Sequence, residues 1–375
     1  VTVDIFVYIC IISTEHCLDE EGRVMAKVLF VSKDIGGASM TIPLAKQVQS
    51  HGHEVVVIAE HLAVKRFEES GFKPYISHPV DFQAYPFVVD VKGALDDTHP
   101  DVVVVSAGFP INLEQLFAVS ASQMNIKLVC IEDYWAVSRK IKPATPTLIL
   151  SIDSYGKKLI QGLYPGVQVE IVGHHEVVAI EQARHDVSGL EILSHKTRGF
   201  DFTCTLIGGG EQTTSQIKLL LGCMKKSSGR WCIVPRFHPK TLQWKDTQGR
   251  VLEDVWNELL KPFGDCVVYV PEVKTETVVA GAHIVASGFS TLMCGAAYIG
   301  KPTLCLKTQE TMEDLHFQSG GILKEVPAVA LQCADVVEEP TDLSKFLGNT
   351  YPRAKEEFKP YDPMIAYRAI KELVS

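Results

Sequence analysis

The sequence lacks paired cysteines, a long apolar run and an excess of positive charge, and each absence excludes a class of protein. The ten cysteines form no CxxC pair and no tight cluster, which argues against a zinc site or a thioredoxin-like motif. Several lie in apolar runs typical of buried strands, which fits a reducing cytoplasm. With 36 Lys and Arg against 45 Asp and Glu, the net charge of −9 leaves no general basic face for nucleic acid. An anionic ligand must therefore be held by local devices such as backbone amides, helix N-termini and a few cations.

The apolar run at residues 5–12 is less than half of the ~20 residues that span a bilayer. Asp4 precedes this run and four further acidic residues follow it, unlike a secretory signal. We interpret residues 1–24 as an appendage to a fold that begins near Met25. A short membrane-associating segment is the alternative, so any membrane association is expected to be peripheral.

The remaining chain is long enough for two domains of about 150 residues each. From Lys27 onward, β-branched runs without polar alternation are separated by amphipathic stretches, a pattern typical of βαβ units around a parallel sheet. The first series of predicted strands covers 28–31, 55–59, 102–106, 128–131, 147–151 and 169–172. The second series covers 202–207, 231–234, 266–270, 283–286 and 303–306. Between the two series, the polar and weakly periodic residues 174–200 are the predicted linker.

Two of the three Gly-rich turns that follow predicted strands have limited specificity. The first contains Gly36 and Gly37, lacks the full dinucleotide spacing and carries no P-loop lysine. It can equally be an ordinary βα turn. The second contains Gly208, Gly209 and Gly210, more glycines than a tight turn requires, which favours a loop that brings backbone amides to a ligand.

The third Gly-rich turn is the most specific of the three. Gly288 follows a predicted strand, and Ser290 and Thr291 then cap an Ala-rich helix that ends at Gly300. Hydroxyls and free amides at a helix N-terminus are a good seat for phosphate. A well-capped helix that binds nothing is the alternative.

Positive groups and carboxylates occur at two other predicted strand ends. Arg236, His238 and Lys240 lie at the end of a second-half strand, where they can meet an anionic ligand or form a solvated basic turn. Glu132 and Asp133 close a strand of the first half, and either can serve as a base if burial raises its pKa.

The residues beside these carboxylates leave two interpretations open. Tyr134 and Trp135 are able to stack on a sugar ring, which favours a catalytic interpretation of the pair. Equally, Asp133 can cap a helix or pair with Arg139.

The chain resembles the GT-B glycosyltransferase superfamily and its relative, the non-hydrolysing UDP-GlcNAc 2-epimerase group. The GGG loop looks like the Gly-rich loop of the transferase that adds GlcNAc to the cell-wall lipid precursor. The stretch SGFSTLMCGAAYIGKP resembles the helix that receives the nucleotide diphosphate, and GGASMTIPLAKQVQSHGHEVVVIAE looks like the opening βα unit of many GT-B enzymes.

This resemblance implies two tandem Rossmann-like domains with a ligand cleft between them and a C-terminal helix that crosses back to the first. The implied boundaries are an appendage at 1–24, an acceptor-side domain at 25–178, a nucleotide-sugar domain at 179–350 and a crossover helix at 351–375. The resemblance implies that the nucleotide is contacted by Gly209, Gly210, Ser290 and Thr291. His316 and Gln318 are the candidates to face the donor sugar.

Two positions depart from the family pattern. The glutamate that commonly binds the donor ribose falls at Gly295, where there is no carboxylate. The histidine frequently found in the first Gly loop corresponds to Ala38 or Ser39.

The leading functional hypothesis is a cytoplasmic GT-B glycosyltransferase that moves a sugar from a nucleotide-diphosphate donor to an unidentified acceptor without metal or other cofactor. Arg236, His238 and the helix that Ser290 caps would stabilise the departing diphosphate. The alternatives are a nucleotide-sugar epimerase, a CDP-polyol phosphotransferase and a catalytically silent binding protein of the same fold.

Overall fold

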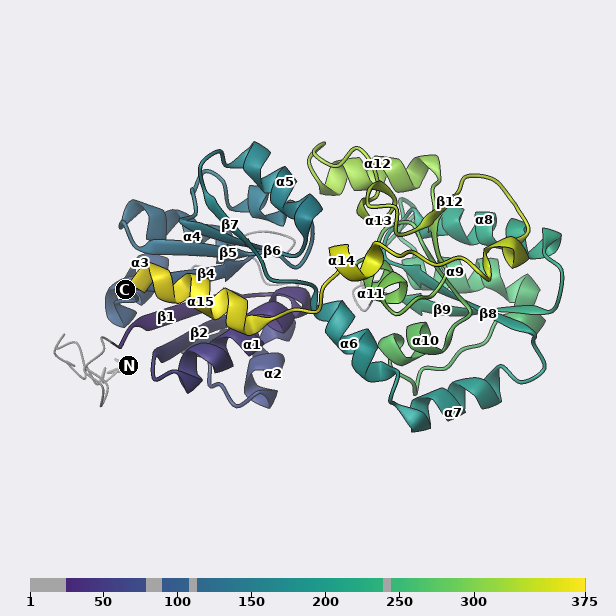
Figure 1. The fold of residues 1–375 in the computed structure, drawn as a ribbon, viewed down its shortest axis with the longest axis horizontal. Helices are drawn as coiled ribbons and strands as arrows, with labels where there is room; N and C mark the ends of the chain where they lie inside the picture. The colour runs from purple at the N-terminus through teal and green to yellow at the C-terminus, as the bar shows by residue number, and fades with distance from the viewer. Residues whose placement is uncertain (1–24, 79–89, 108–112, 239–243, 375) are drawn as a thin grey trace, which may run out of the picture.

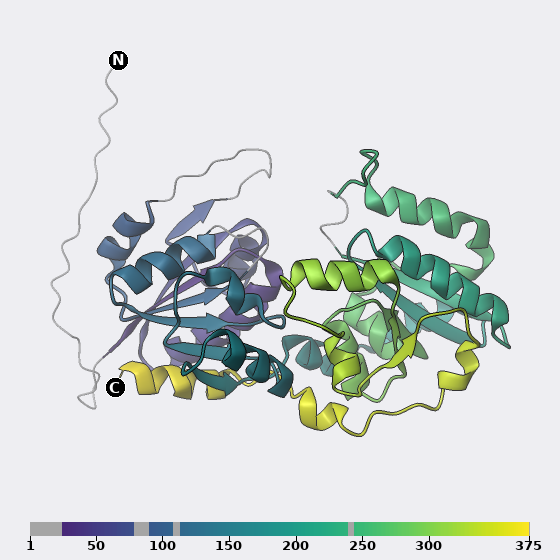
Figure 2. The same ribbon diagram turned by 90° about the horizontal axis from the view of Figure 1, so that it is seen from above.

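The computed structural model describes residues 25–78, 90–107, 113–238 and 244–374, and it arranges them around two parallel sheets (Figures 1 and 2). Within these residues the first sheet has seven strands in the order β3-β2-β1-β4-β5-β6-β7. The second sheet has five strands in the order β12-β11-β10-β8-β9. Order and direction are those expected when helical crossovers join successive parallel strands.

The elements of the first sheet and its helices occupy the chain up to residue 171. The strands are β1 Lys27–Ser32, β2 Glu54–Glu60, β3 Ile76–His78, β4 Val102–Ser106, β5 Lys127–Ile131, β6 Leu148–Ser151 and β7 Gln168–Ile171. The helices are α1 Ile35–Ser50, α2 His61–Glu69, α3 Val91–Thr98, α4 Leu113–Gln123, α5 Ser154–Leu163 and the 3-10 helix η1 Val137–Ile141.

The second sheet and its helices follow, and the last helix returns to the first sheet. The strands are β8 Phe202–Gly208, β9 Trp231–Phe237, β10 Ile284–Ser287, β11 Thr303–Leu306 and β12 Asp335–Val337. The α-helices are α6 His175–Ala183, α7 Val187–Lys196, α8 Thr213–Lys226, α9 Leu252–Leu260, α10 Thr275–Gly281, α11 Leu292–Tyr298, α12 Gln309–Gln318, α13 Pro327–Ala330, α14 Ala354–Glu357 and α15 Pro363–Val374. The 3-10 helices are η3 Lys261–Cys266 and η4 Leu343–Phe346.

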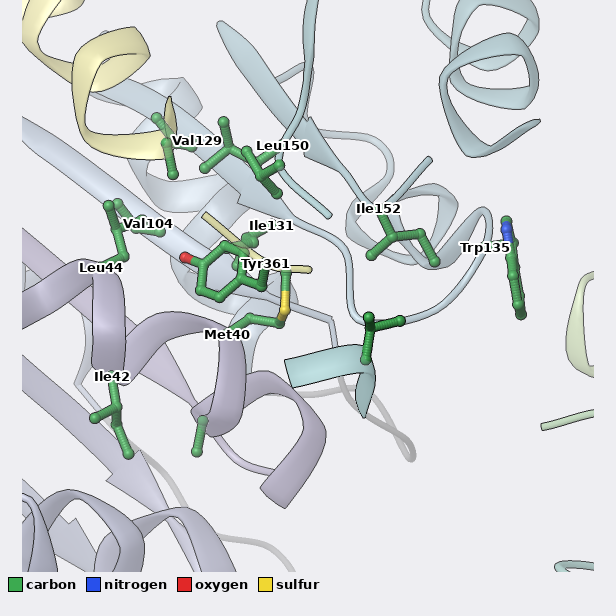
Figure 3. Packing of buried hydrophobic residues seen from close by; sticks show 14 of the residues in the cluster. Met40, Ile42, Leu44, Val104, Val129, Ile131, Trp135, Leu150, Ile152 and Tyr361 are labelled. Carbon is green, nitrogen blue, oxygen red and sulfur yellow. The ribbon is translucent and has the colours of Figure 1, made fainter. Parts of the chain in front are cut away.

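Both faces of the first sheet are covered, which explains its continuous β-branched strands. Alternate residues of β1 belong to two different cores: Phe30 packs with α1, α2 and α15, while Leu29 packs with α3 and α4. Figure 3 shows the first of these cores, with Met40 of α1, Ile131 of β5 and Tyr361 close together. The second sheet is likewise covered by α8 and α9 on one face and by α6, α7, α10 and α11 on the other.

Ten of the eleven predicted strands are confirmed, with small shifts at their ends. The prediction at 266–270 is wrong: Cys266 ends η3, and Val267 forms only an isolated bridge to Ile233. The three-residue strands β3 and β12 were not predicted, because so short a run carries little periodicity.

The chain passes between the sheets twice, and the two crossings pair with each other. His174 N donates to Lys359 O at 2.8 Å, Tyr361 N donates to His174 O at 3.0 Å, and Asp362 N donates to Val172 O at 2.8 Å. After the second crossing, α15 packs on α1 and on strands β6 and β7, as the predicted crossover helix should (Figure 1).

Residues 174–200, the predicted linker, contain helices α6 and α7 rather than an open connection. Both helices pack on α10, and α6 also packs on α11. The crossing itself is therefore short, and α6 begins directly after it at His175.

In the described part of the chain, no helix has the length and the apolar character that a membrane crossing requires. The predicted appendage at 1–24 lies outside the described residues.

Gly173 in the first crossing has a positive φ of 91°, and a Cβ there would overlap the carbonyl oxygen of Pro360. We expect Gly173→Ala to cost about 1 kcal/mol for the left-handed backbone and about 1–3 kcal/mol more for the overlap. Gly166→Ala is the matched control, because Gly166 has a φ of 85° with nothing within 4 Å of its Cβ position. Urea unfolding of both variants tests this, and equal losses of stability would contradict the role of the paired crossings.

Candidate functional site

The first turn of α1 lies directly against the ends of two neighbouring strands. A Cβ at Gly36 would overlap Asp133 Oδ2, and a Cβ at Gly37 would overlap Ser106 Oγ. The two glycines thus let the helix begin close to the carboxyl ends of β5 and β4, where parallel α/β proteins bind ligands. The predicted Gly turn is the first turn of the helix itself, and it places Asp133 where the helix dipole favours an anion.

Asp133 is only partly exposed, and its electrostatic surroundings are mixed. Burial raises the pKa of its carboxyl to about 6, and the nearby carboxylates of Glu176 and Asp34 add to the rise. His175 and Lys140 act in the opposite direction. A carboxyl with a pKa of about 6 can exchange a proton near neutral pH, as an acid–base group requires.

Helix α6 joins Asp133 to the loop that contains Ser290 and Thr291. Thr291 Oγ1 donates to Glu176 Oε1 at 2.5 Å, and Ser290 Oγ accepts from Leu292 N at 3.3 Å. Across the same boundary, the rings of Tyr134 and Phe289 lie 6.4 Å apart. The structure therefore brings the predicted carboxylate of the first half close to the predicted hydroxyls of the second.

Gly295 is packed closely against helix α6. A Cβ at this position would overlap Ile180 Cδ1 and lie 3.2 Å from the carbonyl oxygen of Glu176. Helix α6 thus fills the space that a side chain at 295 would need. The carboxylate of Glu176 in α6 accepts a hydrogen bond from Thr291, directly before α11.

The loop at Gly208, Gly209 and Gly210 forms hydrogen bonds with the start of α8 and with the end of β9. Gly209 N and Gly210 N donate to Thr213 Oγ1 at 3.1 and 3.4 Å. His238 N donates to Gly208 O at 2.9 Å, so His238 lies beside the loop as predicted. Contact of these residues with a nucleotide stays a prediction, and Lys240 lies outside the described residues.

Arg236 and Gly288 make contacts within the second half. The Arg236 NH2 group donates to the carbonyls of Val270 and Val273 at 2.7 and 2.8 Å, and burial lowers its pKa. A Cβ at Gly288 would overlap Gln216 Nε2. Both positions thus have a packing role, and their contact with a diphosphate stays a prediction.

Glu132 and Trp135 are sealed in the first half. Glu132 is 0% exposed, and its Oε1 accepts from Ser138 N and Oγ at 3.2 and 2.8 Å. Trp135 is 2% exposed and donates through Nε1 to Asp153 at 2.8 Å. These contacts support structural roles, and do not support Glu132 as a base or Trp135 as a platform for a sugar.

His316 and Gln318 lie at the exposed end of α12, beside the first half (Figure 2). The Arg139 guanidinium donates to the carbonyl oxygen of Gln318, and the Gln318 amide donates to Asp314 Oδ2 at 2.8 Å. Arg139 therefore bridges to α12 rather than to Asp133, and the predicted contact of His316 and Gln318 with a sugar stays a prediction.

Three residues around Asp133 were not predicted from the sequence: Lys140, His175 and Glu176. Lys140 lies in η1, whose 3-10 turn gives no strong periodicity, and the other two begin α6 in the predicted linker. Asp314, whose pKa burial raises to about 6, was not predicted either. No group of three or more His, Cys, Asp or Glu side chains within the described ranges is arranged to hold a metal ion.

Comparison with known proteins identifies similar structures but no similar sequences. No protein-family model and no curated protein matches the chain. The UDP-GlcNAc 2-epimerase of Methanocaldococcus jannaschii, in complex with UDP-GlcNAc and UDP, has a TM-score of 0.61 at 13% identity over 93% of this chain and 99% of that one. The chain has the GT-B fold.

Two further structures support this assignment. A putative UDP-N-acetylglucosamine 2-epimerase from Listeria monocytogenes has a TM-score of 0.61 at 12% identity, covering 94% of this chain and 96% of that one. Anabaena HepE in complex with UDP-glucose has a TM-score of 0.58 at 13% identity, covering 93% and 99%. Identity this low establishes the fold alone.

The burial of Glu132 predicts a specific dependence of stability on pH. Burial raises the pKa of Glu132 to about 8 from an ordinary value of 4.5. The folded state therefore favours the protonated form, and the resulting stability is full below pH 4.5 and lost as the pH rises through 8. Glu132→Gln stays neutral and keeps the acceptor for Ser138, so we expect its Tm to fall less than that of the wild type as the pH rises from 4.5 to about 8.

Differential scanning calorimetry at several pH values tests this expectation. Glu132→Ala is the control, because it removes the acceptor and should lower the Tm at every pH. Parallel pH curves for the wild type and Glu132→Gln would show that Glu132 is not a buried neutral acid.

Proposed function

We propose that this chain is an enzyme that binds a nucleotide-diphosphate sugar between its two sheets and inverts a carbon of that sugar. The single observation that carries the proposal is Asp133, a partly exposed carboxyl with a pKa of about 6. It lies between the start of α1 and the Glu176–Thr291 pair of the other half. The similar structures bound to UDP-GlcNAc, UDP and UDP-glucose supply the ligand class.

Inversion of a sugar carbon needs a group that removes a proton and a group that returns one on the opposite face. Asp133 and Glu176 come from different halves of the chain, so their carboxyls can approach a bound sugar from different sides. Lys140 lies near Asp133, and its ammonium group can favour the carboxylate form of Asp133 or neutralise the charge of a bound diphosphate.

Epimerisation is favoured over transfer because the residues assigned to the site serve one substrate and none of them requires a second. The hydroxyls of Ser290 and Thr291 and the acids of the cleft are accounted for by the nucleotide sugar alone. The epimerases among the similar structures support the same choice. Transfer to an acceptor, our first hypothesis from the sequence, is thus the second candidate.

Incubation with UDP-GlcNAc and no acceptor separates the two reactions. We expect a C2 isomer of the sugar nucleotide to form without net release of UDP, as followed by NMR of the anomeric protons. Accumulation of free UDP and no isomer would favour transfer with water as a poor acceptor. An unchanged substrate that the protein binds would point to a silent binding protein.

Asp133→Asn should lower kcat about 100- to 10,000-fold, the usual contribution of an acid–base group. Acting as a base, Asp133 must be ionised, so the activity of the wild type should rise with pH up to about 6 and level off above it. Asp101→Asn is the control, because Asp101 lies at the opposite end of the same sheet, where its carboxylate accepts from Lys27 N. A pH profile without this limb, or equal kcat values for both variants, would remove Asp133 from the mechanism.

A further inference from the structure

The turn between β6 and α5 holds the first chain crossing through one carboxylate, Asp153. Its Oδ1 accepts from Gly156 N at 2.7 Å and so caps α5. Its Oδ2 accepts from Trp135 Nε1 at 2.8 Å and lies 3.0 Å from His174 Nε2. Asp153 and His174 are both 0% exposed, so these bonds form away from water and are correspondingly strong.

The same turn also holds the second crossing. Ser154 Oγ donates to Glu357 Oε2 at 2.5 Å, and Glu357 ends α14 directly before the crossing. The next residue, Phe358, packs its ring edge-on against His174 with centroids 5.4 Å apart. One βα turn of the first sheet is therefore in contact with both connections to the second.

The contact with Asp153 indicates which nitrogen of His174 acts as the donor. A carboxylate oxygen only accepts, so His174 Nε2 carries the hydrogen that Asp153 Oδ2 receives. His174 Nδ1 is buried without a partner among the described residues.

We propose that Asp153 is a positioning residue that fixes the spacing between Asp133 and Glu176 across the cleft. Trp135 lies two residues after Asp133, and His174 lies two residues before Glu176, so the Asp153 Oδ2 atom joins the two chain segments that carry these acids. The side-chain hydrogen bonds of Asp153 among the described residues go to Trp135, Gly156 and His174, so it acts on Asp133 and Glu176 through the first and the last of these partners. The effect on catalysis rests on the proposed function, whereas the effect on the crossings does not.

Asp153→Asn tests this role with almost no change of shape. An amide in either orientation must place its NH2 group against N–H donors, either those of Trp135 and His174 or that of Gly156. Asp90→Asn is the matched control, because Asp90 caps α3 through Gly93 N and the Asn side chain can cap equally well.

Hydrogen exchange of the crossing amides is the first measurement. We expect exchange at His174, Tyr361 and Asp362 to be about tenfold faster or more in Asp153→Asn, while the strands of the second sheet stay protected. Spin labels on the exposed residues Glu68 and Glu191 should give a broader distance distribution between the halves. Exchange and distances equal to those of Asp90→Asn would overturn the proposal.

Enzyme kinetics distinguish a positioning role of Asp153 from a purely structural role. We expect kcat of Asp153→Asn to fall about 10- to 100-fold while the affinity for UDP is unchanged, because the misplaced groups act on the reaction step. A loosened crossing with unchanged kcat would overturn the positioning role. If the wild type does not isomerise UDP-GlcNAc, the proposed function fails, and the exchange data still decide whether Asp153 holds the crossings.

Two variants of His174 test the same proposal if Asp153→Asn does not fold. His174→Gln places an amide N–H where Nε2–H stands and can still donate to Asp153, whereas His174→Ala cannot. We expect His174→Gln to keep the protection of Tyr361 and Asp362 and His174→Ala to lose it. Equal protection in the two variants would overturn the proposal.

Discussion

The two chain crossings between the sheets are hydrogen-bonded to each other, and the connection between the two halves depends on that pairing. Three backbone bonds join residues 172–174 to residues 359–362, and Gly173 leaves room for the carbonyl of Pro360. Parallel sheets place their functional groups at the carboxyl ends of their strands. The strand ends of the two sheets can form one site only if the distance between the sheets is fixed. The two crossings are the covalent connections between the sheets.

Two adjacent acids at the end of β5, Glu132 and Asp133, differ in burial and therefore in pKa. Glu132 points into the first half, where Ser138 satisfies one carboxyl oxygen and burial holds the pKa near 8. Asp133 points toward the start of α1 and stays partly exposed, with opposing charges nearby and a pKa of about 6. Ser138 binds the more deeply buried acid into the turn, and its neighbour has the pKa closer to its ordinary value.

The fold was predictable from the sequence because both sheets are covered on both faces, which gives strands such as VVVV in β4 an unmistakable apolar pattern. The site was less predictable, because tertiary packing decides which polar groups remain available. Arg236 bonds to two carbonyls, Trp135 turns inward, and Gly295 is covered by α6. Glu176 was not predicted as a site residue because α6 has a weak amphipathic pattern, in a stretch whose polar composition resembles a linker.

We expect a nucleotide diphosphate to bind between the two sheets, at the Ser290–Thr291 loop. Hydrogen exchange with and without saturating UDP tests it most directly, since a bound ligand shields nearby amides whether or not the protein turns over a substrate. Binding at this loop should slow exchange at residues 288–294 and at the Gly208–Gly210 loop, with no change in β2 or α7. Unchanged exchange at both loops in millimolar UDP would contradict it.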